Sequence, residues 1–149
     1  MKIGDKHYRT IWLADDGWSV KVIDQTFLPH QFEVMRLTDV AEAALAISSM
    51  VVRGAPLIGA TAAYGMALSA HADPSDQALC SAHARLLATR PTAVNLLWAL
   101  DDMRRRILAA PENQRRDVAY ARAADICDDD VARCQGIANH GCQLIEEVF

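Results

Sequence analysis

The residues best suited to chemistry are Arg53, Gly54 and Ala55, which stand just before Pro56 and a long apolar segment. Proline has no backbone N–H and a fixed φ, so we expect a helix to begin at about Pro56. Gly54 leaves room for a ligand to approach the unpaired N–H groups of that helix start. The partial positive charge there and the Arg53 guanidinium suit a phosphate or carboxylate. The segment predicts an anion site; the alternative is that Arg53 is a solvated loop charge.

A second segment repeats this order, with Arg90 followed by Pro91 and then by an apolar stretch. A residue before proline is held in extended geometry, which projects the Arg90 side chain away from the helix that follows. Thr92 has a hydroxyl that can cap this helix. Arg53 and Arg90 can share one anion if the two helices pack side by side with matching ends. The alternative is that Arg90 is an ordinary surface residue.

Composition narrows the class of protein. The 149 residues carry a formal net charge of −4, and 52% of them are hydrophobic. This balance argues against a nucleic-acid-binding protein, because such proteins hold phosphates with an excess of basic residues. No apolar run approaches the ~18 residues needed to cross a membrane, and residues 1–5 do not resemble a signal peptide. We therefore expect a cytoplasmic protein without membrane contact.

The possible metal ligands have no recognisable arrangement. The four cysteines, Cys80, Cys127, Cys134 and Cys142, form no CxxC pair and lack zinc spacing, so we interpret them as reduced thiols. The acidic residues of segment 125–130 point to different sides of a helix and are interpreted as solvated. The sequence thus predicts no metal and no cofactor.

Residues 1–37 have the pattern of a small antiparallel sheet. Segments 7–13 and 18–24 are rich in β-branched and aromatic residues, and Asp16-Gly17 between them is a hairpin signal. Segment 31–37 alternates again and could add a third strand. We expect two or three strands here.

Residues 38–149 have the pattern of about five helices, at 39–50, 56–70, 75–88, 93–109 and 114–149. Asp39 and Glu42 are spaced as a capping box. The last segment carries an apolar seam, and Gly136 and residues 139–141 are places where its helix could end or bend. The seam consists of Tyr120, Ala124, Cys127, Val131, Cys134, Ala138, Cys142, Ile145 and Val148. The fold class is therefore α+β, predominantly α, in one domain over residues 1–149.

Several charged residues are interpreted as solvated at this level. His71 and His83 fall near helix surfaces, where a solvated histidine is the simpler interpretation than a ligand. The charged segment 101–106 is expected to form a solvent-facing side of its helix.

Four motifs in this order resemble one family of enzymes. They are KHYRTIW at 6–12, IDQT followed by LP at 23–29, VVRGAPLIG at 51–59 and ATRPTAVNL at 88–96. Together they resemble the methylthioribose-1-phosphate isomerase family over nearly the whole chain. The wider family includes regulatory subunits of a translation initiation exchange factor and ribose-1,5-bisphosphate isomerases, which share chiefly the arginine motifs.

The resemblance implies an aldose–ketose isomerase of methionine salvage that converts 5-methylthioribose 1-phosphate to 5-methylthioribulose 1-phosphate without a required metal. By position in the motifs, Arg53, Gly54, Ala55 and Arg90 would bind the sugar phosphate. The family's catalytic cysteine and aspartate belong to a later Rossmann-like domain, and none of the four cysteines here occupies that motif. No catalytic residue is therefore assigned to this chain.

This difference predicts that the chain is the amino-terminal, substrate-binding part of such an enzyme and is inactive alone. A part of this kind would leave apolar surface uncovered, so we expect a homo-oligomer, a dimer, associating through the final helix. The alternatives are a regulatory module of the initiation-factor type that binds a phosphorylated ligand, and a ribose-1,5-bisphosphate isomerase.

Overall fold

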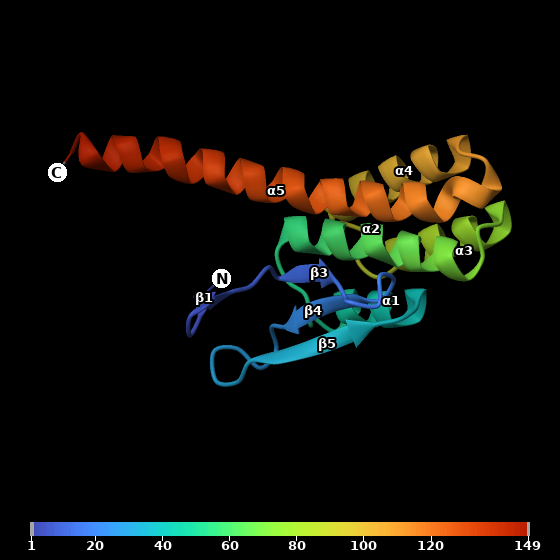
Figure 1. The fold of residues 1–149 in the computed structure, drawn as a ribbon, viewed down its shortest axis with the longest axis horizontal. Helices are drawn as coiled ribbons and strands as arrows, with labels where there is room; N and C mark the ends of the chain where they lie inside the picture. The colour runs from blue at the N-terminus through green and yellow to red at the C-terminus, as the bar shows by residue number, and fades with distance from the viewer. Residues whose placement is uncertain (1, 149) are drawn as a thin grey trace.

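A small antiparallel sheet precedes five α-helices in the computed structural model, which describes residues 2–148 (Figure 1). The sheet consists of β3 (Ile11–Leu13), β4 (Val20–Asp24) and β5 (Glu33–Leu37), in that order. Val22 of β4 lies opposite Ile11 on one side and Met35 on the other. The predicted fold class, with a three-stranded antiparallel sheet, is therefore confirmed.

The strand predicted over residues 7–13 is interrupted. Its beginning belongs to a separate two-stranded pair, in which β1 (Lys2–Ile3) lies antiparallel to β2 (Lys6–His7). Only Ile11–Leu13 joins the larger sheet. The expected third strand is present but begins two residues later than predicted, at Glu33.

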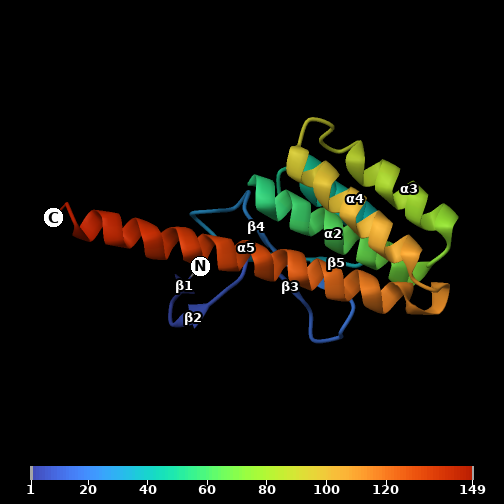
Figure 2. The same ribbon diagram turned by 90° about the horizontal axis from the view of Figure 1, so that it is seen from above.

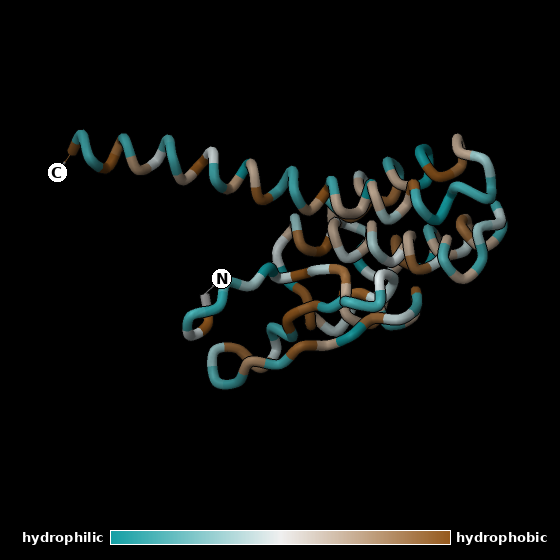
Figure 3. Tube along the Cα trace, in the orientation of Figure 1, coloured by the Kyte–Doolittle hydropathy of each residue, from teal (hydrophilic) through white to brown (hydrophobic). Residues whose placement is uncertain are grey.

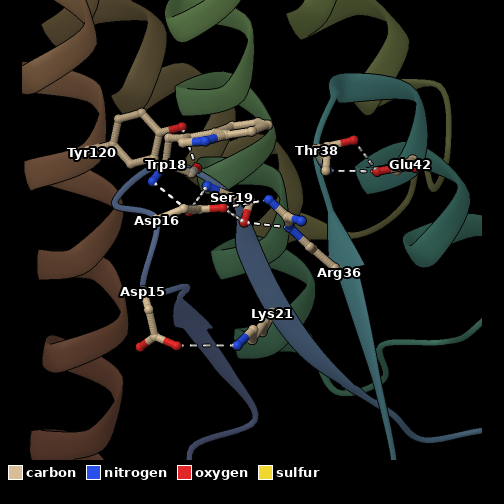
Figure 4. Close-up of polar contacts among 9 residues, drawn as sticks. All are labelled: Asp15, Asp16, Trp18, Ser19, Lys21, Arg36, Thr38, Glu42 and Tyr120. Carbon is tan, nitrogen blue, oxygen red and sulfur yellow. Dashed lines mark hydrogen bonds and ion pairs between the residues drawn. The ribbon is translucent and has the colours of Figure 1, made fainter.

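The predicted hairpin turn is held by Asp16 (Figure 4). Its carboxylate accepts hydrogen bonds from the backbone N–H groups of Trp18 and Ser19, at 3.0 and 2.9 Å, and from the Ser19 hydroxyl at 2.6 Å. Arg36 on β5 adds an ion pair at 2.5 Å. These donors, led by the Ser19 hydroxyl, hold the pKa of Asp16 well below its usual range. The turn is thereby tied to the far strand of the sheet.

The helices follow the predicted segments closely. They are α1 (Val40–Ser48), α2 (Ala55–Ala72), α3 (Asp76–Leu87), α4 (Val94–Ala109) and α5 (Arg115–Glu146), with a short 3₁₀ helix η1 (Glu112–Gln114) before the last. Asp39 caps α1 by accepting from the Glu42 N–H at 2.8 Å, as predicted. The Glu42 carboxylate accepts in turn from the N–H and hydroxyl of Thr38 (Figure 4).

Helix α2 lies at the centre of the bundle (Figure 2). Every residue from Leu57 to Ala70 is buried, and α2 packs against α1, α3, α4 and α5. A helix that is apolar on all sides is stable only when it is surrounded. Its small residues permit close packing: a Cβ added at Gly65 would lie 3.0 Å from Leu86 and 3.2 Å from Ala43.

Helix α5 continues without a break from Arg115 to Glu146, so neither predicted bend ends it. Its buried residues are Arg115, Ala119, Ala123, Ile126 and Cys127. The predicted seam was partly wrong, since Ala124, Cys134 and Cys142 are exposed. The reason is length: α5 extends well beyond the helices against which it packs (Figure 1).

The two histidines singled out above are not simply solvated. His83 on α3 is only 9% exposed, and its Nε2 lies 3.0 Å from an Asp101 carboxylate oxygen on α4. The His71 ring stacks on Trp18 with centroids 5.0 Å apart, and its Nδ1 is buried. Each ring packs against a residue that is distant in sequence, and the spacing of neighbouring residues cannot predict such a contact.

The expectation of a solvent-facing charged side at residues 101–106 was wrong for Asp102. This residue is 6% exposed, and its carboxylate accepts hydrogen bonds from three arginines. Arg105 and Arg106 belong to the same helix, at 2.5 and 3.2 Å, whereas Arg122 reaches it from α5 at 2.6 Å. Asp102 thus joins α4 to α5.

Candidate functional site

The start of α2 has the geometry expected of an anion site. Gly54 is the N-cap residue with φ 93°, a left-handed conformation that favours glycine, and no side chain caps the helix. Pro56 lies in the first turn, as predicted. The segment from Arg53 to Pro56 is exposed, so first-turn N–H groups can meet a ligand from solvent.

The start of α4 is likewise without a side-chain cap. Ala93 is its N-cap residue, and its N–H donates to the Arg90 carbonyl at 3.0 Å in a turn. The predicted cap by Thr92 is therefore absent. Both arginine segments lead into a helix whose first N–H groups have no side-chain partner.

The two helices lie side by side with their starts at the same end (Figure 2). A Cβ added at Gly59, in the second turn of α2, would lie 3.0 Å from the backbone oxygen of Asn95 and 3.6 Å from the Cβ of Ala99. Asn95 is in the first turn of α4. Gly59 therefore permits close packing of the two helix starts, which is the arrangement that a shared anion requires.

Each predicted arginine also has a contact within the chain. Arg53 donates to the Gln25 carbonyl at 2.8 Å, next to the end of β4. The Arg90 guanidinium lies 3.5 Å from the Met50 sulfur. Met50 precedes Arg53 by three residues, so Arg90 contacts the loop that carries Arg53. Met50 itself has φ 65°, which marks a sharp turn of that loop.

Two hollows flank the start of α2, and they meet at Pro56, Asp130 and Cys134. One, of about 420 Å³, lies between residues 7–11, α2 and α5. The other, of about 620 Å³, lies between α2, α4 and α5 and is lined by Asn95 and Trp98 among others. Arg53, Gly54, Ala55 and Arg90 line neither hollow, although Pro56 adjoins Ala55.

The two arginine motifs contain Pro56 and Leu57 but none of the other residues that line the first hollow, so they do not predict this hollow. Arg9 lines it and pairs with Asp128 of α5 at 2.5 Å. The hydrogen bond that Arg9 donates to this carboxylate raises the pKa of Arg9. The available signal was that Arg9 belongs to the conspicuous motif at 6–12.

Cys127 is the buried thiol beside this hollow. Burial raises its pKa to about 11, so the sulfur is protonated at neutral pH and is a poor nucleophile. Across residues 2–148 no three His, Cys, Asp or Glu side chains are grouped so as to hold a metal ion. Within that same range, no helix has the length and apolar character to cross a bilayer.

Curated relatives are similar to this chain along almost all of its length. Methylthioribose-1-phosphate isomerase of Methylocella silvestris is 55% identical over 148 residues, covering 99% of this chain and 40% of that protein. The isomerase of Acidiphilium cryptum is 58% identical over 146 residues, again 40% of its length. The chain thus spans about 40% of the length of these relatives, and the similarity is to their amino-terminal portion.

Two crystal structures share the fold. One is translation initiation factor eIF-2B, subunit delta, from A. fulgidus, with TM-score 0.77 and 36% identity, covering 84% of this chain and 38% of that one. The other is 5-methylthioribose 1-phosphate isomerase from Pyrococcus horikoshii, with TM-score 0.76 and 37% identity, covering 85% and 37%. Residues 51–149 match the model of the initiation factor 2 subunit family. Because that match takes in more than half of the chain, the chain belongs to the initiation factor 2 subunit family.

Proposed function

We propose that this chain is the amino-terminal, substrate-binding part of a cytoplasmic aldose–ketose isomerase that converts 5-methylthioribose 1-phosphate to 5-methylthioribulose 1-phosphate in methionine salvage. The observation that carries the proposal is the 51–58% identity to methylthioribose-1-phosphate isomerases over nearly the whole chain. The adjacent, uncapped starts of α2 and α4 support it, because they offer N–H donors where a phosphate could bind.

In this proposal the phosphate of the sugar binds the N–H groups of Gly54 and Ala55 and the guanidinium groups of Arg53 and Arg90. A planar guanidinium can donate two parallel hydrogen bonds to a phosphate, which fixes the direction of the ligand as well as its charge. Moving hydrogen between C1 and C2 of the sugar needs an acid–base group. We assign no such group to residues 1–149, so the chain alone is expected to bind the sugar phosphate without converting it.

Replacing either arginine tests the assignment. Arg53→Ala and Arg90→Ala are each expected to weaken binding of 5-methylthioribose 1-phosphate by roughly 10–100-fold, because each removes a charge-assisted hydrogen bond worth about 1.5–3 kcal/mol. Titration calorimetry on the 149-residue chain measures this. Arg104→Ala is the matched control, since Arg104 is exposed elsewhere on α4. Unchanged affinity in both arginine variants would contradict the assignment.

A regulatory role is the second candidate, because the likeness to the eIF-2B delta subunit is as close as that to the solved isomerase. Thermal unfolding separates the two, since a ligand at about 100 times its Kd stabilises the folded state by about 2.7 kcal/mol. Stabilisation by 5-methylthioribose 1-phosphate alone supports the isomerase. Stabilisation by nucleotides instead would favour a regulatory module, and a preference for ribose 1,5-bisphosphate would favour the related isomerase.

A further inference from the structure

A turn formed by the IDQT motif lies where β4 ends, at residues 23–26. The chain passes there from hydrophobic to hydrophilic residues (Figure 3), and Ile23 is fully buried, so the turn begins from a fixed point of the core. One Asp24 carboxylate oxygen accepts from the Thr26 N–H at 2.9 Å and from the Thr26 hydroxyl at 2.6 Å. A carboxylate that bonds the backbone two residues further on stabilises a turn of this type. Asp24 therefore holds the backbone of Gln25, which lies between the two residues.

Gln25 joins this turn to the loop that carries Arg53. Its N–H donates to the Val51 carbonyl at 2.9 Å, and its carbonyl accepts from the Arg53 guanidinium at 2.8 Å. The loop is itself anchored, because Val52 is fully buried and donates its N–H to the Ala46 carbonyl at 3.2 Å. The backbone on both sides of the contact is thus held, and the exposed Arg53 side chain reaches from one side to the other.

The Gln25 carbonyl orients the guanidinium and leaves its charge free for an anion. An exposed arginine has many rotamers, and fixing one of them opposes binding. The bond to Gln25 selects among these rotamers before a ligand arrives. It engages one of the five N–H groups of the guanidinium, and others can donate to phosphate oxygens. A carbonyl has no net charge, whereas Arg9 faces the Asp128 carboxylate at 2.5 Å and would hold a phosphate less well.

We propose that Asp24 is a positioning residue of the anion site. By holding the turn, Asp24 keeps the Gln25 carbonyl in place, and that carbonyl fixes the direction of the Arg53 guanidinium beside the start of α2. The inference rests on the proposed function, in which Arg53 binds the phosphate of the sugar. Asp24 itself contacts no ligand in this arrangement, so its loss should cost less affinity than the loss of Arg53.

Titration calorimetry of the 149-residue chain with 5-methylthioribose 1-phosphate tests this role. Asp24→Ala should weaken binding by about 3–10-fold, because an arginine that is free to move must be ordered by the ligand. Asp24→Asn should bind as the wild type does, since an amide oxygen accepts the same two bonds. The matched control is Asp73→Ala, at the opposite end of α2, where the Asp73 carboxylate accepts from the Ser75 N–H at 2.9 Å in a turn of the same type. It should leave the affinity unchanged.

An Arg53→Ala background separates positioning from a general loss of structure. There Asp24→Ala should weaken binding no further, because the side chain through which it acts is absent. Thr26→Val is a milder variant, since it removes only the hydroxyl bond at an exposed residue. It should weaken binding about twofold in the wild type and not at all in the Arg53→Ala background. Equal weakening in both backgrounds would show that the turn supports the fold alone and would overturn the proposal.

Nuclear magnetic resonance of the ligand-free chain tests the positioning directly. The order parameter of the Arg53 Nε–H bond should fall in Asp24→Ala and stay unchanged in Asp73→Ala. An equally ordered Arg53 in Asp24→Ala, or wild-type affinity of that variant, would refute the role of Asp24 alone. If the wild type did not bind the sugar phosphate, or if Arg53→Ala bound it as tightly as the wild type, the proposed function would fail instead. The order parameter would still decide whether Asp24 holds Arg53.

Discussion

Asp102→Ala is expected to lower the free energy of unfolding by about 3–5 kcal/mol, because removing one partner of a buried ion pair leaves the others uncompensated. Three guanidinium groups donate to this 6% exposed carboxylate, and Arg122 is itself largely buried. Without Asp102, the ion pairs left to Arg122 within residues 2–148 are the longer ones with Asp125 and Asp129, at 3.9 and 3.7 Å. Urea unfolding at neutral pH measures the loss.

Asp125→Ala is the matched control for this experiment. It removes a carboxylate that is 66% exposed and faces the same Arg122, so its cost should be below about 1 kcal/mol. Similar unfolding midpoints for Asp102→Ala and Asp125→Ala would show that burial of the Asp102 carboxylate adds nothing to the free energy of unfolding.

The same carboxylate gives stability a defined pH dependence. Burial acts to raise the pKa of Asp102, but hydrogen bonds from Arg122, Arg105 and Arg106 outweigh it and lower the pKa. The unfolded chain therefore protonates this carboxyl first as the pH falls. Its contribution is present above about pH 4, the ordinary aspartate range, and is lost as the pH falls through the folded pKa. Asp102→Asn should flatten this acid-side loss relative to the wild type.

Gly59→Val is expected to destabilise the fold by about 2–3 kcal/mol and to weaken binding of the sugar phosphate at the same time. The added Cβ alone would lie 3.0 Å from the Asn95 backbone oxygen, and the Cγ atoms need further space between α2 and α4. A backbone oxygen cannot rotate away as a side chain can. The two helix starts must therefore separate, which would also displace Arg53 from Arg90.

Gly136→Ala is the control for Gly59→Val. A Cβ at Gly136 meets nothing within 4 Å, so this substitution should stabilise α5 by about 0.5–1 kcal/mol through helix propensity alone. Urea unfolding and titration calorimetry measure both variants. If Gly59→Val unfolded and bound ligand as the wild type does, close packing of α2 and α4 would be irrelevant to the site.

Local signals in the sequence were sufficient for most elements of the fold. Pro56 marks the start of α2 and Asp39 caps α1, because each acts within a few residues of itself. The errors concern partners that are distant in sequence. His83 contacts Asp101, and Asp102 contacts Arg122, and neither spacing forms a recognisable motif. The buried residues of α5 end at Cys127, because the helix extends beyond the other helices from there on (Figure 1). The periodicity of the α5 sequence cannot predict where its neighbours end.

Less of the candidate site than of the fold could be predicted from the sequence. Pro56 and Pro91 predict helix starts after Arg53 and Arg90, but neither proline indicates whether the two starts lie side by side. That adjacency depends on Gly59 packing against α4, a contact between residues more than thirty positions apart. The directions of the two guanidinium groups depend on Gln25 and Met50. Each hollow is lined by residues from three separate segments of the chain, so no single motif predicts it.

The burial of the central part of α2 has a consequence for how this protein unfolds. Every residue of the helix from Leu57 to Ala70 is buried, and α2 packs against four other helices. Its central amide protons can exchange with solvent only after those neighbours have separated, so their exchange should report global unfolding. A molecule held at the first turn of α2 would then slow hydrogen exchange along the whole helix, well beyond the residues that it touches.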